Sequence, residues 1–150
     1  MGPLSIEKYL VSVDMKPIFR LVLTSFCISA HTLNIEQGRR TGHTLEQRVC
    51  QCDNISIEDE FHFLLVCPRY NDLRTEFIPP RYHTVPNIHK FIHLLQSDKD
   101  IIIRNTSKFL FYAFKRRNEF TLISILICLC LYFPFVSVSL ICKLFSPEFS

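Results

Sequence analysis

The sequence predicts a mainly α-helical fold, in which a small irregular helical module is followed by a hydrophobic C-terminal helix. Three observations predict it. Apolar residues recur three and four positions apart in several short segments, three of the seven cysteines lie close to a histidine between residues 50 and 67, and the run 120–142 carries no charge. We therefore divide the 150 residues into a lead-in (1–28), a central module (29–80), a helical extension (81–118) and a hydrophobic tail (119–150).

The lead-in is expected to contain one helix, near residues 18–28. Residues 1–15 have little pattern and start abruptly, as a piece of a longer reading frame would. The apolar residues that follow them recur at helical spacing. They are Ile18, Leu21, Val22, Phe26 and Ile28.

The stretch 34–42 is more polar, and we predict that it forms a loop. It contains Gly38 and Gly42, which favour irregular backbone, beside Arg39 and Arg40. The two arginines could touch phosphate, or they could simply lie exposed to solvent.

The clearest helix-start signal lies in the central module. Ser56 followed by Asp59 fits a capping box, so we expect a short amphipathic helix to begin near Ile57. The acidic run 58–60 would lie in its first turn, where negative charge favours the positive end of the helix dipole. The apolar face of this helix would consist of Ile57, Phe61, Leu64 and Leu65.

Pro68 predicts a break in this helix. Five residues of ideal helix rotate a side chain by about 500°, so His62 and Cys67 would point about 140° apart if the helix were continuous. Pro68 disfavours helical geometry at Cys67 and suits the first position of a new helix, which we expect to end at Pro79 and Pro80. The apolar face of the new helix would consist of Tyr70, Leu73 and Phe77.

Four residues around this break have the pattern of a zinc site. Cys50, Cys52, His62 and Cys67 are spaced C-x-C-x9-H-x4-C, and three cysteines with one histidine can close a tetrahedral structural site for Zn²⁺. The C-x-C spacing is tighter than the usual gap between paired cysteines. The alternative is that these residues are buried thiols and a packed histidine without a metal.

The same residues resemble the cysteine/histidine region near the C-terminus of reverse transcriptases encoded by non-LTR retrotransposons. The resemblance lies in Arg48-x-Cys50, Ile57-Glu58-Asp59-Glu60-x-His62-Phe63-Leu64-Leu65, Cys67-Pro68-x-Tyr70 and Leu73-Arg74, with Ser29-x-His31-x-Leu33-x-Ile35-Glu36-x-Gly38-Arg39 upstream and Ala113-Phe114-Lys115-x-Arg117 downstream. It covers about two thirds of the chain and implies a zinc-binding fragment of a polymerase that could contact RNA or DNA. The residues expected to make that contact are Arg39, Arg40, Arg48, Arg69 and Arg74.

The chain is not expected to be an enzyme by itself. Polymerase chemistry needs carboxylates that hold two metal ions, and the sequence contains neither such a set nor the aromatic-Asp-Asp turn of these polymerases. Only three glycines are present, and none forms a phosphate-binding loop. The net charge of +3 permits nucleic-acid contact without arguing for it, and we expect no small-molecule substrate.

The helical extension is expected to contain two helices after an extended linker, residues 78–86, which holds three prolines. Asn87 can cap the first helix, and Ser97 or Asp98 can cap the second, which we expect to end near Arg117. The apolar face of the first helix would consist of Ile88, Phe91, Ile92 and Leu95. Its His89 and His93 lie one turn apart, and without a third ligand nearby we interpret them as solvated rather than metal-bound.

The tail is predicted to cross a membrane once, through residues 120–142. As a helix this run would extend roughly 35 Å against a hydrocarbon core of about 30 Å. The basic residues 115–117 outnumber Lys143, so the N-terminal part should face the cytosol. Without insertion, the chain would be cytoplasmic or nuclear.

Two other interpretations of the whole chain remain open. It could be a single-pass membrane protein with a cytosolic zinc-stabilised module, or an inert pseudogene product whose tail is non-coding sequence read in frame. Seven cysteines is an odd number, and no secretory signal opens the chain, which indicates a reducing compartment.

Overall fold

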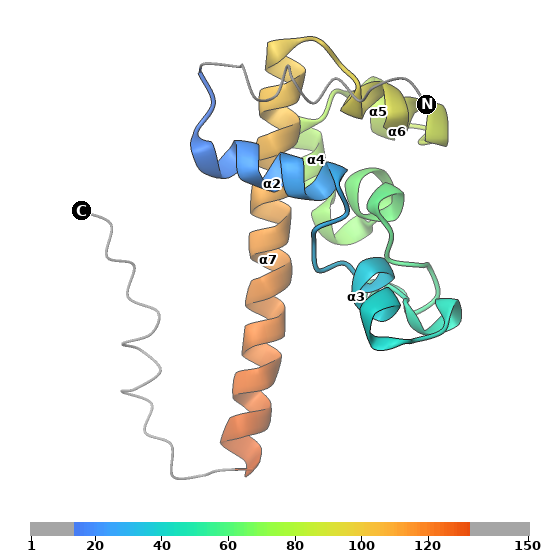
Figure 1. Cartoon of the computed structure of the whole chain (residues 1–150), viewed down its shortest axis with the longest axis vertical. Helices are drawn as coiled ribbons and strands as arrows, with labels where there is room; N and C mark the ends of the chain where they lie inside the picture. The colour runs from blue at the N-terminus through green and yellow to red at the C-terminus, as the bar shows by residue number, and fades with distance from the viewer. Residues whose placement is uncertain (1–13, 133–150) are drawn as a thin grey trace, which may run out of the picture. The chain divides into compact units, whose positions relative to one another are not determined.

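The computed structural model describes the backbone of residues 14–132 and the side chains of residues 14–118. This part of the chain is mainly helical, as predicted, and its only pairing of extended backbone is an isolated antiparallel bridge between Val49 and Ile57. The helices are α2 (Pro17–Cys27), α3 (Asn34–Thr41), α4 (Asn71–Phe77), α5 (Pro80–His83), α6 (Ile88–Leu95) and α7 (Asp100–Tyr132), with 3-10 turns at Leu45–Gln47 and Pro68–Tyr70 and a π turn at His62–Val66 (Figure 1).

The chain divides into two units, residues 1–114 and 115–150, and the boundary between them falls within α7. In the first unit α2 crosses α7, because Phe19 lies 5.3 Å from Phe111 between ring centroids and Phe26 lies 6.4 Å from Phe114. The ring of Phe63 in the π turn lies 4.7 Å from that of Phe114. The predicted helix near residues 18–28 is therefore confirmed as α2, and its aromatic face joins the central module to α7.

The stretch 34–42 is α3 and not the predicted loop. The Glu58 carboxylate accepts a hydrogen bond from the Asn34 backbone N–H at 2.8 Å, which stabilises the start of the helix. Gly38 is buried against the Arg48 side chain, so a residue of low helix propensity is needed there for close packing. Gly42 ends the helix with a φ of 75°, in the left-handed region that favours glycine.

The central helix begins three residues later than predicted. It starts at Glu60, and Asp59 accepts a hydrogen bond from the His62 backbone N–H at 2.8 Å. Ser56 does not cap this helix, since its hydroxyl donates to the Asp53 carboxylate, and Ile57 forms the isolated bridge instead. The predicted capping box was therefore wrong because a turn and a bridge take up these residues first.

The break at Pro68 is confirmed. Cys67 has φ −53° and ψ 121°, outside the helical region, and Pro68 is the first residue of the following 3-10 turn. α4 ends before Pro79, also as predicted. The predicted linker 78–86 is wrong in part, because Pro80 opens the short helix α5, a position at which proline loses no hydrogen bond.

The predicted helix after Asn87 is confirmed as α6. The Asn87 side chain accepts a hydrogen bond from the Lys90 backbone N–H at 2.9 Å. The face of α6 that packs inward centres on Leu94, whereas Ile88 and Ile92 are 53% and 43% exposed. The apolar face predicted for this helix was therefore only partly right.

α7 runs without a break from Asp100 to Tyr132, past the predicted end near Arg117. The predicted membrane span, residues 120–142, lies outside the described side chains, and its last part lies outside the described backbone. Within the described part of the chain, no helix combines the length and the apolar character needed to cross a membrane.

Candidate metal centre

The four cysteine and histidine residues that the sequence suggests as metal ligands come together in the structure. One potential ligand atom from each of Cys50, Cys52, His62 and Cys67 lies within 4.8 Å of the other three. Cys50 and Cys52 come from the turn that follows the isolated bridge, His62 opens the π turn, and Cys67 lies at the break before Pro68. We call these four residues the metal cluster, and residues 48–67, which carry them, the metal corner.

The distances within the metal cluster fit tetrahedral coordination. The sulfurs of Cys50 and Cys67 lie 3.7 Å apart, and the Cys52 sulfur lies 3.3 Å from His62 Nε2. Metal–sulfur bonds of about 2.3 Å at tetrahedral angles place two sulfurs about 3.8 Å apart. A disulfide would need about 2.0 Å, so Cys50 and Cys67 are free thiols. The cluster could therefore hold a metal ion.

Backbone hydrogen bonds fix the turn that carries the first two cysteines. The Cys50 N–H donates to the Ser56 carbonyl at 2.7 Å, and the Glu58 N–H donates to the Arg48 carbonyl at 2.9 Å. Inside this small loop, the Asn54 N–H donates to the Cys50 carbonyl at 2.9 Å. The Cys50 and Cys52 thiols are therefore presented from a backbone that is closed at both ends.

The π turn brings the side chains of His62 and Cys67 towards the same side of the helix. The Cys67 N–H donates to the His62 carbonyl at 2.7 Å, a bond between residues five apart instead of four. A π turn takes more residues per turn than an α-helix, so the fifth residue comes closer to the face of the first. The sequence predicted that the helix must loosen before Cys67, but it carried no signal that a π turn would form there.

Arg74 of α4 donates hydrogen bonds to the backbone of the metal corner. It is 2% exposed, and its Nε donates to the Leu64 carbonyl at 2.9 Å while its Nη2 donates to the Cys67 carbonyl at 2.8 Å. Both carbonyls belong to the irregular backbone near the break, where helix bonding leaves acceptors without partners. Burial lowers the pKa of Arg74, although the neighbouring Cys67 opposes this shift. Arg74 therefore stabilises the backbone around a candidate ligand.

The pKa values of the four candidate ligands depend on one another. A hydrogen bond from Cys67 lowers the pKa of Cys50 to about 4, whereas burial, together with the neighbouring Cys50, raises that of Cys52 to about 11. The pKa of Cys67 is raised chiefly by its interaction with Cys50, and that of His62 is raised for the same reason. One thiolate thus suppresses the ionisation of the others. A bound cation would allow all three to ionise.

Comparison with known proteins identifies no similar protein. No family model, no curated protein and no solved structure matches the chain. The description of the metal cluster therefore depends on its own donor atoms and geometry.

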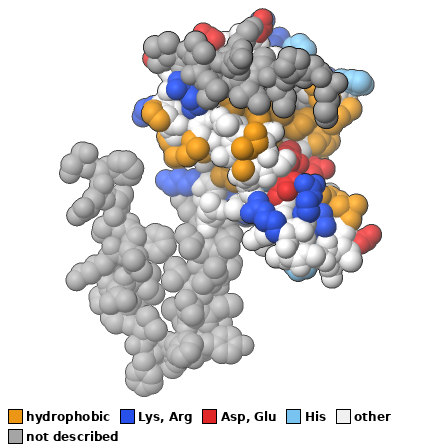
Figure 2. Space-filling model, viewed as in Figure 1, with side chains coloured by type: hydrophobic (Ala, Val, Ile, Leu, Met, Phe, Trp, Pro, Cys, Tyr) orange, Lys and Arg blue, Asp and Glu red, His pale blue; other side chains and the backbone are white. Residues whose placement is uncertain are grey.

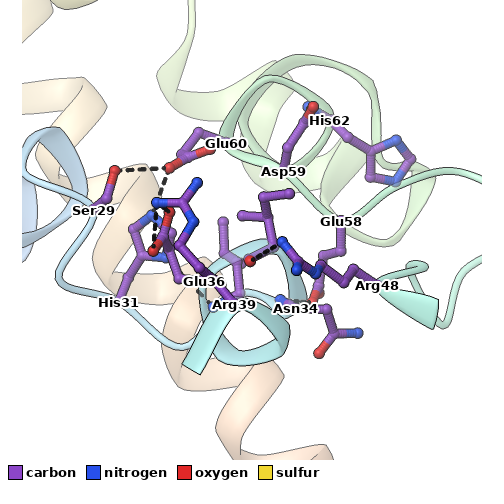
Figure 3. A network of polar contacts seen from close by, with 12 residues as sticks. Ser29, His31, Asn34, Glu36, Arg39, Arg48, Glu58, Asp59, Glu60 and His62 are labelled. Carbon is purple, nitrogen blue, oxygen red and sulfur yellow. Dashed lines mark hydrogen bonds and ion pairs between the residues drawn. The ribbon is translucent and has the colours of Figure 1, made fainter. Parts of the chain in front are cut away.

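The acidic run 58–60 is part of the polar network that holds the module together (Figure 3). Glu60 accepts hydrogen bonds from the Ser29 hydroxyl at 3.2 Å and from His31 Nε2 at 3.0 Å, and the interaction with buried His31 lowers the pKa of Glu60. Ser29 has a φ of 56°, a conformation that side chains rarely adopt. Together with the bond from Asn34 to Glu58, these contacts join the segment before α3 to the metal corner.

The arginines expected to contact nucleic acid are divided between surface and interior. Arg39 on α3 is 64% exposed at its side chain and pairs with Glu36 at 3.0 Å. Arg40 is exposed and donates to the His31 carbonyl at 2.8 Å. Arg48 is half-buried and donates to the carbonyl of Ile35 in α3 and to that of His43, which follows α3. Figure 2 shows Lys and Arg side chains gathered beside acidic ones over this region.

The other two predicted arginines lie at the metal corner. Arg69 is half-buried, with its Nη1 3.4 Å from the Gln51 side-chain oxygen, next to the turn that carries Cys50. Arg74 is the buried residue described above. The structure therefore brings Arg39, Arg40 and Arg48 to one part of the module and places Arg69 and Arg74 at another.

Proposed function

We propose that the chain is a non-catalytic, zinc-stabilised module of a reverse transcriptase-like protein, and that it contacts RNA or DNA. The observation that carries this proposal is the convergence of Cys50, Cys52, His62 and Cys67 at distances that suit a tetrahedral ion. Three thiolates and one imidazole form a soft donor set that suits Zn²⁺. Four protein ligands also fill a tetrahedral coordination sphere, which is typical of a structural site.

The roles of the nearby carboxylates support a structural function for this region. The Glu58 carboxylate accepts the N–H at the start of α3, and the Asp59 carboxylate accepts the His62 N–H at the start of the central helix. The Glu60 carboxylate accepts hydrogen bonds from His31 and Ser29. Each carboxylate of the acidic run is therefore engaged in holding the backbone or a neighbouring side chain.

Nucleic-acid contact is supported by exposed arginines on α3. The Arg40 guanidinium uses one N–H for the His31 carbonyl, and an arginine has five N–H groups to offer. Arg39 lies beside it with most of its side chain in solvent. Adjacent guanidinium groups on an exposed helix can bind phosphates of a nucleic-acid backbone. Arg74 contributes to this function only through the stability of the metal corner.

Metal analysis of the purified full chain tests the zinc site. We expect one zinc per chain in the wild-type protein and none in the Cys67→Ser variant, because losing a ligand opens the site. Cys27→Ser is the matched control, since Cys27 is a half-buried cysteine outside the metal cluster. A wild-type protein without zinc, or a Cys67→Ser variant that keeps a full equivalent, would contradict the proposal.

Salt-dependent binding of a labelled single-stranded RNA tests the nucleic-acid contact. Each phosphate neutralised should add about 0.7 to the slope of log affinity against log salt concentration. We expect replacing Arg39 and Arg40 together by glutamine to reduce this slope by about 1.4. Binding that is indifferent to salt, or an unchanged slope in this double variant, would remove α3 from the proposed interface.

A further inference from the structure

α5 and α6 form an open cavity with basic and aromatic walls. It has a volume of about 430 Å³ and is lined by Arg81, Tyr82, His89, Lys90 and His93. Small-ligand sites have volumes of about 300–1,000 Å³. None of the lining residues that the structure describes is acidic. The cavity therefore offers positive charge and hydrogen-bond donors, and no carboxylate of these residues opposes an anion.

A chain of hydrogen bonds fixes the inner side of this cavity. The Arg81 guanidinium lies 4.8 Å from the centre of the Tyr82 ring, and its Nη2 donates to the Tyr82 hydroxyl at 3.0 Å. That hydroxyl lies 3.0 Å from His93 Nδ1. Because the hydroxyl accepts from Arg81, its own proton can be donated to His93 Nδ1, which places the N–H of the imidazole on Nε2. Buried Tyr82 thus orients both a cation and a histidine.

The cationic side chains keep donors for a ligand. The Lys90 ammonium donates to the Val85 carbonyl at 2.8 Å and has three N–H groups in all, and Arg81 has five. Arg81, His89 and His93 are exposed, and Figure 2 shows histidine side chains at the surface where α5 and α6 lie. An anion with several oxygens could therefore take hydrogen bonds from both helices at once.

We propose that this cavity binds a nucleotide unit, with its phosphate against Arg81 and Lys90 and its base against the histidine rings. Arginine and lysine are the usual partners of phosphate, and histidine rings and guanidinium planes stack on unpaired bases. The planar groups favour a nucleotide over a phosphate that carries no ring. Its source is either a free nucleotide or an unpaired residue of single-stranded RNA. The second source rests on the proposed nucleic-acid contact and adds a site that is separate from the arginines of α3.

Binding of a fluorescent single-stranded RNA and of adenosine monophosphate to the full chain tests this proposal. For RNA, Lys90→Gln should weaken binding about fivefold to tenfold and lower the salt slope by about 0.7. His89→Ala should weaken binding about fivefold or more without changing the slope, because it removes a stacking surface rather than a charge. Lys99→Gln is the control for net charge, since Lys99 is exposed and does not line the cavity. We expect its affinity to match the wild type.

The outcomes separate the two ligand sources and the two proposals. Direct binding of adenosine monophosphate that Lys90→Gln weakens, together with RNA binding that this change leaves unaltered, assigns the cavity to free nucleotides. Lys90-dependent RNA binding that the mononucleotide does not displace assigns it to RNA. If wild type and Lys90→Gln bind both ligands equally, the proposal that the cavity binds a nucleotide is overturned. The proposed function still stands in that case if the Arg39 and Arg40 double variant weakens RNA binding. A chain that binds neither ligand contradicts both.

Discussion

The metal corner, α5, α6 and residues 100–114 of α7 contribute buried residues to the same hydrophobic core, but they are held in place by different means. The metal corner contains an isolated bridge and a π turn, a 3-10 turn follows it directly, and buried His62 and Glu58 lie within it. α6 and the first half of α7 are regular helices, and the buried residues of α7 include Phe109, Leu110 and Ala113. The metal corner combines buried apolar side chains such as Phe63 with polar contacts and candidate metal ligands, whereas α6 and residues 100–114 of α7 depend mainly on apolar packing.

This difference predicts which change should damage which region. Apolar burial contributes about 25 cal/mol per Å² and is spread over many side chains, so a packed helix weakens gradually. An irregular backbone depends on a few partners, and the loss of one leaves buried polar groups unsatisfied. The predictions below therefore compare changes in or beside the metal corner with changes in α6 and α7.

Arg74→Met should have the largest effect, about 4 kcal/mol on the free energy of unfolding. The change removes two charged hydrogen bonds, each worth about 1.5–3 kcal/mol, and leaves the carbonyls of Leu64 and Cys67 without these donors. Urea denaturation measures the loss, and titration with metal should show a weaker site. Lys99→Met replaces an exposed cation between α6 and α7 and should change stability by about 0.5 kcal/mol at most. Similar losses for the two variants would contradict the assigned role of Arg74.

Leu110→Ala should cost about 3 kcal/mol while leaving the metal content unchanged. Leu110 is fully buried in α7, and a leucine truncated in a packed core leaves a cavity. Denaturation gives the cost, and elemental analysis of the folded protein gives the metal content. Loss of metal together with stability would show that the two regions are not independent.

Gly38→Ala should destabilise the wild-type chain but stabilise a chain in which Arg48 is also changed. A Cβ at Gly38 would lie 2.5 Å from Cγ of Arg48, so it must displace a side chain that donates to two backbone carbonyls. We expect a loss of about 1–2 kcal/mol, since displaced hydrogen bonds outweigh the gain of about 1 kcal/mol in helix propensity. In an Arg48→Ala background the same change should stabilise α3. A double-mutant cycle by thermal denaturation measures this, and additive effects would rule out the contact.

Asp59→Ala and Asn87→Ala should have the smallest effects, about 1 kcal/mol each. Each side chain accepts one backbone N–H at the start of a helical segment, Asp59 in the metal corner and Asn87 before α6. Urea denaturation compares the two. Because both caps are local, a loss several times larger at Asp59 would mean that this cap also positions His62.

The sequence predicted the features that depend on local chemistry. The cap at Asn87, the break at Pro68 and the position of α2 follow from residue types with strong backbone preferences, and all three are confirmed. The grouping of Cys50, Cys52, His62 and Cys67 is also confirmed, because the ligand pattern is visible in the spacing alone.

The features that the sequence did not predict depend on contacts between distant segments. α3 forms although it contains Gly38, because Arg48 packs over that glycine and Glu58 receives the first N–H of the helix. The helix expected at Ile57 starts later because Ile57 pairs with Val49. The role of Arg74 depends on two carbonyls that are left without helical partners at the break. None of these pairings has a signature at fixed spacing in the sequence.

Hydrogen exchange of the full chain before and after metal chelation tests the central claim most directly. The amides of Cys50, Glu58 and Cys67 make the hydrogen bonds that close the metal corner, whereas those of residues 92–95 in α6 and 104–114 in α7 make regular helical bonds. We predict that chelation removes the protection of the first group and leaves that of the second, because structural zinc can supply on the order of 10 kcal/mol to the segment that binds it. Equal protection of the metal corner with and without metal would contradict the account, and so would the simultaneous loss of protection in both regions.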